Sequence, residues 1–424
     1  MPLYRLLSAL ALLLYAPWAL LRSIAGKRRL GDVRGRLGRA AYPDADGGVW
    51  IHAVSVGEVG VARNLLAALS RRHPDRRLVL SVTTAAGREL AGRVAGPSVP
   101  VFAFPFDLAG PVERSLDAVR PGLVLLTETE IWPLFLERAA ARGIPVALVN
   151  GRISTRSFRR YSFVRAALSA SLARIGLFAM QSPADADRIR SLGAPADRVR
   201  ATGNVKYDLP EAGAFSDAVR LRAAAAGRPV LVAASTAEGE EAIVLEVWGG
   251  LPSPRPLLAL APRRPERFDA AASLVQKSGR SLVRRSSTDP VPAPADVYLL
   301  DSIGELASLY REARLAFIGG SFASVGGHNP IEAWAAGVPA VVGPHTENFA
   351  DIVADGAARG FLRKVATPAA LREELARALS DAAATAETGA RARRFVEENR
   401  GAAARTIELL SPWLDAGRKR QAAP

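Results

Sequence analysis

Residues 317–344, with the sequence FIGGSFASVGGHNPIEAWAAGVPAVVGP, decide the fold of this chain. An apolar strand over 315–318 runs into a loop that has four glycines within the nine residues 319–327. A short helical run follows and stops at Gly337, and a second apolar strand is expected over 339–342. Strand, glycine-rich loop, helix and strand form a βαβ unit whose loop can present backbone N–H groups to a phosphate. The stretch therefore predicts a nucleotide site.

The segment from Asn329 to Glu332 also has a purely structural explanation. Asn329 is a good N-cap, Pro330 fits the first helical position, Glu332 completes a capping box, and Gly337 suits the position after the helix. Glu332 could equally accept hydrogen bonds from ribose hydroxyls. The four glycines in front of the helix exceed what a cap requires, and this favours the nucleotide site.

Composition indicates a two-domain α/β protein with an anionic partner. At 424 residues the chain is longer than one ordinary hydrophobic core supports. Its formal net charge of +15 favours nucleic acid, acidic lipid or a phosphorylated substrate as partner. No nucleic-acid-binding motif accompanies the arginines, so we expect no nucleic-acid partner and favour a membrane or anionic lipid. The chain has no cysteine and no H-x-x-x-H pair, and its Asp-x-Asp motifs at 44–46 and 185–187 are typical of a turn and a helix start; we expect neither metal nor cofactor.

Residues 1–40 predict an N-terminal membrane anchor with a basic segment after it. The stretch 6–21 has no charge and would cover about 24 Å as a helix, a marginal span for a hydrocarbon core of about 30 Å. Seven Lys and Arg residues lie between Arg22 and Arg39, which suits the cytoplasmic leaflet. No small-residue cleavage site separates the two parts, so we expect an uncleaved anchor with the body of the protein in the cytoplasm.

Apolar segments alternate with helical runs over 41–208 and predict a first Rossmann-like domain. The expected strands are 49–55, 78–83, 101–104, 123–127, 146–149, 175–181 and 198–203. A turn at 56–58 and an amphipathic helix over 59–72 follow the first strand. This alternation predicts a parallel sheet with helices on both faces.

A second series predicts another Rossmann-like domain over 229–395, after a hinge at 209–228. The expected strands are 229–233, 257–261, 281–284, 297–300, 315–318 and 339–342. One helix is expected over 371–399, and a final helix to Leu414 is followed by a basic tail. Two such halves bind ligands at the carboxyl ends of their strands, so we expect the site in a cleft between them.

Ionisable residues come directly after the strands of the first domain. Glu58 follows the first strand, where the helix dipole would stabilise a carboxylate by about 0.3–1 kcal/mol, and taken alone this structural explanation would prevail. Glu128 and Glu130 continue the buried strand LVLLT, where Glu128 needs a partner or a raised pKa. Lys206 is either a surface charge at the domain end or an ammonium that reaches a phosphate.

Arginines supply two further candidate sites. Arg152, Arg156 and Arg159 form either a solvated helix face or a basic rim for a phosphorylated acceptor, and both readings remain open. Arg263, which follows a strand of the second domain, is placed to bind a nucleotide phosphate. The shared placement of these residues at strand ends favours a nucleotide-using transferase.

The order and wording of several segments resemble the 3-deoxy-D-manno-octulosonic acid (Kdo) transferases of lipopolysaccharide assembly. The segments cover nearly the whole chain and read HAVSVGEV, TETEIWP, NGRIS, TGNVKYD, LAPRRPERF, SIGEL and GGSFASVGGHNPIEAWAAGVPAVVGPHTENF. The resemblance implies the GT-B glycosyltransferase fold, an α/β architecture of two Rossmann-like domains facing across a cleft. It also implies that residues 396–424 hold a C-terminal helix that crosses back to the first domain.

The resemblance also implies roles for individual residues. Glu58, in SVGE, corresponds to the catalytic base, and Glu128 and Lys206 correspond to groups that stabilise the transition state. The positions that correspond to CMP contacts are Pro262, Arg263, Ile303, Gly304, Glu305, Asn329, Pro330, Ile331 and Glu332. The implied reaction is an inverting, metal-independent transfer of Kdo from CMP-Kdo to a lipid A precursor (lipid IVA), on the cytoplasmic side of the bacterial inner membrane.

The sequence leaves two alternatives to a Kdo transferase. One is another GT-B enzyme that acts on a nucleotide sugar, such as an epimerase. The expected N-terminal anchor and the SVGE segment that contains Glu58 are evidence against an epimerase. The other is a non-catalytic protein that binds anionic lipid, which would not need Glu58 beside an intact glycine-rich loop.

Overall fold

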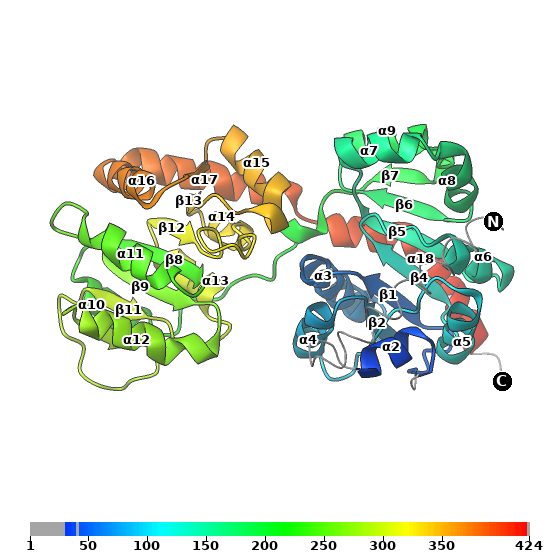
Figure 1. Ribbon diagram of the computed structural model, residues 1–424, viewed down its shortest axis with the longest axis horizontal. Coiled ribbons are helices and arrows are strands. Elements are labelled where there is room, and N and C mark those ends of the chain that lie inside the picture. Colours follow the sequence, from blue (N-terminus) through cyan, green and yellow to red (C-terminus); the bar gives the residue numbers. More distant parts are fainter. Residues whose placement is uncertain (1–29, 40–41, 422–424) are drawn as a thin grey trace. The chain divides into compact units, whose positions relative to one another are not determined.

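The structure is a computed structural model that describes residues 30–39 and 42–421, and they form two compact units (Figure 1). The first unit runs up to Asp208 and resumes at Asn399, and the second is Leu209–Glu398. The apolar stretch of the expected membrane anchor, residues 6–21, lies outside the described residues. Within the described ranges, no helix has the length and apolar character needed to cross a membrane.

A seven-stranded sheet forms the centre of the first unit. Its strands are β1 (Val49–Ala53), β2 (Leu78–Val82), β3 (Val101–Phe102), β4 (Leu123–Thr127), β5 (Val146–Gly151), β6 (Leu177–Met180) and β7 (Val199–Ala201). They are all parallel and lie in the order β3-β2-β1-β4-β5-β6-β7. The order reverses between β1 and β4, so the loops after these two strands flank the position where doubly wound sheets bind ligands.

Helices cover both faces of the first sheet. They are α2 (Leu30–Arg36), α3 (Val56–Arg72), α4 (Ala85–Val94), α5 (Ala109–Val119), α6 (Pro133–Ala141), α7 (Thr155–Ser162), α8 (Arg165–Leu172), α9 (Pro183–Ser191) and α18 (Ala402–Gln421). Two apolar clusters result, one on each face. Because both faces are buried, the strands are continuous apolar runs, and this makes them easy to locate from sequence.

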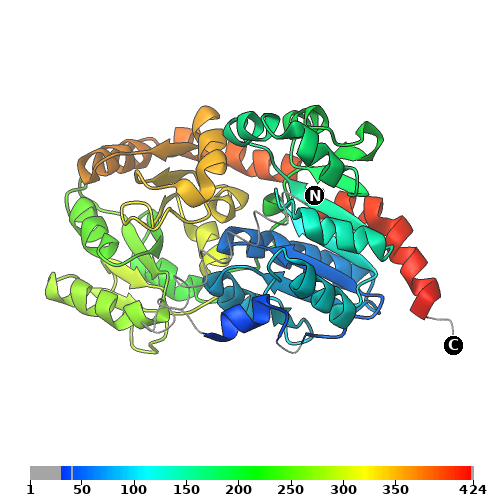
Figure 2. The ribbon, with the colours of Figure 1, turned by 45° about the vertical axis from the view of Figure 1, so that its right-hand side comes forward.

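The C-terminal helix α18 is part of the first unit. Ile407, Leu410 and Leu414 are buried in the same cluster as α3. Figures 1 and 2 show α18, drawn in red, alongside the first sheet. The Asp208 carboxylate holds the start of this helix, accepting hydrogen bonds from the N–H of Gly401 (2.5 Å) and of Ala403 (2.6 Å).

The second unit repeats the architecture. Its strands are β8 (Val230–Thr236), β9 (Leu257–Pro262), β10 (Leu282–Arg284), β11 (Val297–Leu299), β12 (Leu315–Ile318), β13 (Ala340–Val342) and β14 (Leu362–Lys364). All are parallel, in the order β10-β11-β9-β8-β12-β13-β14. The order reverses between β8 and β12, so the glycine-rich loop after β12 lies at the equivalent position of this sheet.

The helices of the second unit, with the one that leads back to the first, complete the fold. They are α10 (Ala218–Ala225), α11 (Glu240–Gly249), α12 (Phe268–Lys277), α13 (Leu306–Leu309), α14 (Ile331–Ala335), α15 (Ala350–Ala358), α16 (Pro368–Ser380) and α17 (Ala382–Asn399). Trp248 and Trp334 are among its largest fully buried side chains.

Several boundaries differ from those expected from the sequence. Residues 56–58 are the first turn of α3 rather than a separate turn, and the single helix expected over 371–399 is two helices that meet at Asp381. The short strand β14 was not expected, and α18 continues through the expected tail to Gln421. Residues 209–228, expected as a hinge, include α10 and cluster with the second unit.

Candidate functional site

The Glu58 carboxylate lies at the carboxyl end of β1, in the first turn of α3, and is only 7% exposed. Its Oε2 accepts hydrogen bonds from the Val54 N–H and the Thr127 hydroxyl, both at 2.8 Å, and Ser55 Oγ donates to Oε1 at 3.2 Å. Thr127 is the last residue of β4, so Glu58 joins the ends of the two strands that flank the reversal in strand order. The carboxylate is held from several sides.

The Thr127 hydroxyl has one proton and two acceptors within reach. It lies 2.8 Å from Glu58 Oε2 and 2.8 Å from the carbonyl oxygen of His52. When Glu58 is ionised, the hydroxyl can donate to the carboxylate. When Glu58 is protonated, the carboxyl can donate to the hydroxyl oxygen, and the hydroxyl then donates to His52. Both protonation states of Glu58 are therefore satisfied without movement of a side chain.

An ion pair lies beside this carboxylate. Lys206 Nζ is 2.7 Å from Glu128 Oε1, and the two side chains are 16% and 20% exposed. Glu128 has a φ of +56°, a left-handed conformation that is uncommon outside glycine and costs on the order of 1 kcal/mol. The chain before Lys206 is fixed by Asn150 Oδ1, which accepts from the Val205 N–H at 2.9 Å. The structure thus brings together Glu58, Glu128 and Lys206, the three residues that the resemblance assigns to catalysis.

Burial and mutual repulsion raise the pKa values of the glutamates here. Burial raises the pKa of Glu58, and the Glu128 carboxylate raises it further, while the hydrogen bonds from Val54, Thr127 and Ser55 lower it. Burial, with smaller contributions from the Glu58 and Glu128 carboxylates, raises the pKa of Glu130 to about 8, and the Trp132 side chain opposes this rise. Glu130 was not among the catalytic candidates of the sequence, although its place in TETE, two residues after Glu128, was a signal.

Replacing Glu130 with Gln should stabilise the protein in alkaline solution. A carboxyl with a raised pKa binds more protons in the folded state than in the unfolded state, so its contribution to stability is present at low pH and is lost as pH rises from about 4.5 to about 8. Since Gln is neutral throughout, the free energy of unfolding should rise by roughly 1–3 kcal/mol at pH 9 and stay near the wild-type value at pH 4.

Urea unfolding of both proteins at pH 4 and pH 9 measures this effect. Glu89→Gln is the control, because Glu89 is an exposed residue of α4 whose partner, Arg93, lies 3.5 Å away. A Glu130→Gln protein that is no more stable than wild type at pH 9 would show that ionisation of Glu130 does not destabilise the folded state.

The arginines expected at the acceptor site differ in their surroundings. The backbone carbonyl of Arg152 accepts a hydrogen bond from Thr129 Oγ1, which ties it to the loop after β4. Arg156 and Arg159 are exposed on α7, a helix without a buried residue. Phe163 follows that helix and is 90% exposed. The surface over α7 and Phe163 therefore combines guanidinium groups with an exposed aromatic ring.

In the second unit, the charge of Arg263 acts on His328. Arg263 follows Pro262, the last residue of β9, and its N–H donates to the Thr236 carbonyl at 3.0 Å. Its side chain is exposed. Burial and, to a smaller extent, Arg263 lower the pKa of His328 to about 4, against the opposing effect of Glu240. His328 is therefore neutral at pH 7.

The first amides of the glycine-rich loop are taken by a side chain of the protein itself. Glu240, 1% exposed at the start of α11, accepts through Oε2 from the N–H of Gly320 (2.6 Å) and through Oε1 from the N–H groups of Ser321 (2.8 Å), Phe322 (2.8 Å) and Ala323 (3.3 Å). The expectation that this loop presses its N–H groups against a phosphate is therefore wrong for 320–323.

The remaining donor-site candidates have mixed surroundings. Asn329 Oδ1 accepts from the Ile331 N–H at 3.0 Å, but α14 begins at Ile331 and its N-cap is Pro330, one residue later than the expected Asn329. Gly337 has a φ of +80° just after the other end of α14. Ile303 is 68% exposed and Gly304 has a φ of +92°. Although burial raises the pKa of Glu305, hydrogen bonds from Ser216, Ser302 and Arg285 leave it below its ordinary value.

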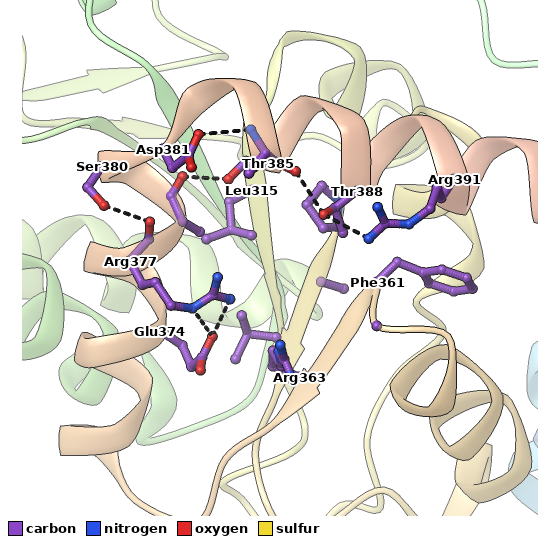
Figure 3. A pocket seen from close by; sticks show the side chains of 16 residues that line it. Leu315, Phe361, Arg363, Glu374, Arg377, Ser380, Asp381, Thr385, Thr388 and Arg391 are labelled. Carbon is purple, nitrogen blue, oxygen red and sulfur yellow. Dashed lines mark hydrogen bonds and ion pairs between the residues drawn. The ribbon is translucent and has the colours of Figure 1, made fainter.

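The second unit also contains a cavity of about 470 Å³ at the end of its sheet where strands β12 and β13 begin. It is lined by the first residues of β12 and β13, by Phe361 and Arg363, and by α16 and α17 (Figure 3). Glu374 and Arg377 pair at its side at 2.7 Å. None of the residues expected to bind the donor lines this cavity.

The two Asp-x-Asp motifs have structural partners. Asp185 Oδ1 accepts from the Ile153 N–H at 2.8 Å, and Asp44 pairs with Arg120 at 3.0 Å. In the part of the chain that the structure describes, no group of three or more His, Asp or Glu side chains could hold a metal ion.

Comparison with known proteins agrees with this architecture. The family model described as 3-deoxy-D-manno-octulosonic-acid transferase (kdotransferase) matches residues 29–209, and the model described as glycosyl transferases group 1 matches residues 292–395. The solved glycosyltransferase of kitacinnamycin has a TM-score of 0.53 at 16% identity, covering 88% of this chain and 100% of that one. The two parallel-sheet units and these matches define a glycosyltransferase of the GT-B fold.

The relatives narrow this class to one family. The 3-deoxy-D-manno-octulosonic acid transferase of Bordetella pertussis is 38% identical over 90% of each chain. The transferase of the same name from Haemophilus influenzae is 35% identical over 92% of each chain. The chain belongs to the 3-deoxy-D-manno-octulosonic acid transferase family.

Proposed function

We propose that this enzyme transfers Kdo from CMP-Kdo to a phosphorylated lipid A precursor, lipid IVA, during lipopolysaccharide synthesis, by an inverting displacement without a metal ion. The observation that carries the proposal is the buried Glu58 carboxylate at the reversal in strand order, beside the Glu128–Lys206 ion pair, in a chain of this family. The site is a base held in a fixed orientation beside a paired ammonium group.

Glu58 acts as the general base in this reaction. An acceptor hydroxyl oxygen attacks the anomeric carbon of Kdo while its proton passes to Glu58, and the bond from that carbon to the CMP phosphate oxygen breaks. Lys206 stabilises the negative charge that develops, and Glu128 fixes the position of the ammonium group. The Thr127 hydroxyl oxygen can accept a hydrogen bond from the resulting carboxyl and donate its own proton to the His52 carbonyl, so the protonated base also has a partner.

The second unit binds the CMP portion. Arg263, exposed at the end of β9, has the guanidinium geometry that binds phosphate oxygens through two N–H groups. Asn329–Glu332 and Ile303–Glu305 complete the nucleotide site, as the resemblance implies. His328 adds no positive charge there at pH 7, because its pKa lies at about 4.

Mass spectrometry of the product tests the reaction directly. Purified enzyme with CMP-Kdo and tetra-acylated lipid A precursor should give a lipid whose mass exceeds that of the precursor by the mass of added Kdo. The rate of CMP release should be the same with and without EDTA. Hydrolysis or epimerisation of nucleotide sugars without a Kdo-bearing lipid would favour another GT-B activity. Binding of the lipid without release of CMP would favour a non-catalytic lipid-binding protein.

The α7 surface should contribute to binding at an anionic membrane. Arg156, Arg159 and Phe163 are exposed. Each basic residue near an anionic bilayer contributes about 1 kcal/mol to the free energy of membrane binding. The double variant Arg156→Gln and Arg159→Gln should therefore bind vesicles with phosphatidylglycerol roughly 10-fold or more weakly, with a smaller effect at high salt.

Vesicle co-sedimentation measures this binding, and the KM for the lipid acceptor gives a second readout. Arg391→Gln is the matched control, because Arg391 is an exposed arginine of α17 in the second unit. Equal vesicle binding by the double variant and wild type would show that these arginines of α7 do not contribute to membrane binding.

A further inference from the structure

The Glu240 carboxylate fills a nest of backbone amides in the donor-binding unit. Five N–H groups point at its two oxygens: those of 320–323 and that of Ala237, which lies 2.8 Å from Oε2. Successive amides of a glycine-rich loop are a common binding site for phosphate, and a carboxylate is an anion of similar acceptor geometry. Here the protein supplies this anion from its own chain.

Glu240 joins the two loops that flank the reversal in strand order of the second sheet. Ala237 follows β8, and Gly320 follows β12. Gly319, directly after β12, lies so close to the end of β8 that an added Cβ would be 2.7 Å from the Ser235 carbonyl oxygen and 2.8 Å from Glu240 Oε2. Ser235, at the end of β8, has a strained φ of +52°. The carboxylate is therefore the link between two loops in close contact.

The contacts of the loop extend from Glu240 to the expected donor site. Gly320 donates its N–H to Glu240 and accepts at its carbonyl from the Gly327 N–H at 2.8 Å. The His328 ring packs on Gly320 so tightly that an added Cβ there would lie 2.8 Å from it. Asn329, the first residue of the expected CMP-binding segment, comes next in the chain. A shift of the 320–323 amides would therefore move Gly327, His328 and Asn329.

The first unit contains a glutamate in a comparable place. Glu58 accepts from the N–H of Val54, directly after β1, and reaches across to β4, as Glu240 accepts from the N–H of Ala237, directly after β8, and reaches across to the loop after β12. Glu58 accepts one backbone N–H, whereas Glu240 accepts five. The Glu58 carboxylate can therefore still accept a proton or a further hydrogen bond, whereas the Glu240 carboxylate is occupied by backbone N–H groups.

We propose that Glu240 is a positioning residue of the donor site, an internal anion that occupies the amide nest of 320–323 and thereby fixes Gly327–Asn329 for binding of CMP. This rests on the proposed function only in its choice of ligand. It implies that the donor phosphate does not bind at 320–323 and depends instead on groups beyond the nest, such as Arg263.

Calorimetric titration with CMP and amide hydrogen exchange test this together. In Glu240→Gln the carboxamide places an NH₂ group against N–H donors, so we expect the dissociation constant for CMP to rise at least 10-fold and the amides of 320–327 to exchange at least 10-fold faster. In Glu240→Ala, sodium formate should restore CMP binding several-fold by placing a carboxylate in the nest, while neutral formamide should not. Glu240→Asp, which keeps the anion on a shorter side chain, should lie between wild type and Glu240→Gln.

Glu374→Gln is the matched control, because Glu374 is a paired glutamate of the same unit that lines the cavity where strands β12 and β13 begin, whereas Glu240 lies where β8 and β12 end. Wild-type CMP affinity and wild-type exchange in a folded Glu240 variant would overturn the proposal, as would equal rescue by formamide. If Glu240→Ala does not fold, amide hydrogen exchange and CMP titration of the Glu240→Gln and Glu240→Asp variants test the proposal. If the wild-type enzyme does not bind CMP, the proposed donor is wrong, and the exchange of 320–327 alone decides the role of Glu240.

Discussion

A Glu58→Gln enzyme should keep its fold and its affinity for CMP while kcat falls by about 10²–10⁴-fold, the usual contribution of a general base. The carboxamide has the same shape. With its oxygen in the place of Oε2 it can still accept from the Val54 N–H, and its NH₂ group in the place of Oε1 can donate to Ser55 Oγ, so the local structure should persist. It cannot accept the acceptor's proton. Loss of turnover without loss of CMP binding is therefore the signature expected of this position.

The pH dependence of the wild-type enzyme gives an independent test of the same residue. Burial and the Glu128 carboxylate raise the pKa of Glu58, and only the ionised form can act as a base. As pH rises, kcat/KM should therefore increase through a limb that lies above pH 4.5, the ordinary value for a glutamate.

Stopped-time assays of CMP release over pH 4–9 and CMP titrations of the variant measure these quantities. Asp117→Asn is the control, because Asp117 is an exposed acid of α5 that pairs with Arg142 at 2.8 Å. Near-wild-type transfer by Glu58→Gln would eliminate Glu58 as the base.

Removal of residues 402–424, the whole of α18, should unfold the first unit. Ile407, Leu410 and Leu414 are at most 1% exposed, and removing large buried side chains of this kind costs about 2–5 kcal/mol each. Their combined loss, roughly 6–15 kcal/mol, is comparable to the whole stability of an ordinary domain. The Asp208 carboxylate would also lose its partner at Ala403.

Limited proteolysis followed by peptide mapping measures this outcome. Peptides from 42–208 should become cleavable while those from 229–395 stay protected, because the second unit is one continuous segment. A chain that ends after Asp415 retains the three buried residues and should resist proteolysis as wild type does. Protection of 42–208 in the shorter chain would show that the first unit does not need α18.

Strands and the large features of the fold could be predicted from the sequence because parallel strands are buried on both faces. β4 and β12 have the expected bounds, 123–127 and 315–318. Short edge strands carry less signal: β14 has only three residues, two of them exposed, and was missed. The helix α3 was expected to start at residue 59, because Gly57 and Glu58 resemble a turn, but it starts at Val56. The Glu58 side chain is held at the ends of β1 and β4, and these strands lie too far apart in the sequence for a local pattern to show the contact.

The catalytic candidates came from the family resemblance, with which their place after strand ends agrees. The structure brings these three residues, Glu58, Glu128 and Lys206, together. The occupant of the glycine-rich loop could not be predicted. Glu240 and Glu241 look like ordinary acids at a helix start, and only the approach of β8 to β12 shows that Glu240 fills the nest. Local pattern identifies a nest of amides, but tertiary contacts decide which anion occupies it.

The division of the first unit between both ends of the chain has a consequence for its synthesis. A ribosome would complete Leu209–Glu398 as one uninterrupted piece, which could fold as soon as it emerges. The earlier-made first unit would still lack α18, with the groove that receives Leu410 and Leu414 open to chaperones or to neighbouring chains. We therefore expect the piece translated first to reach its native state last.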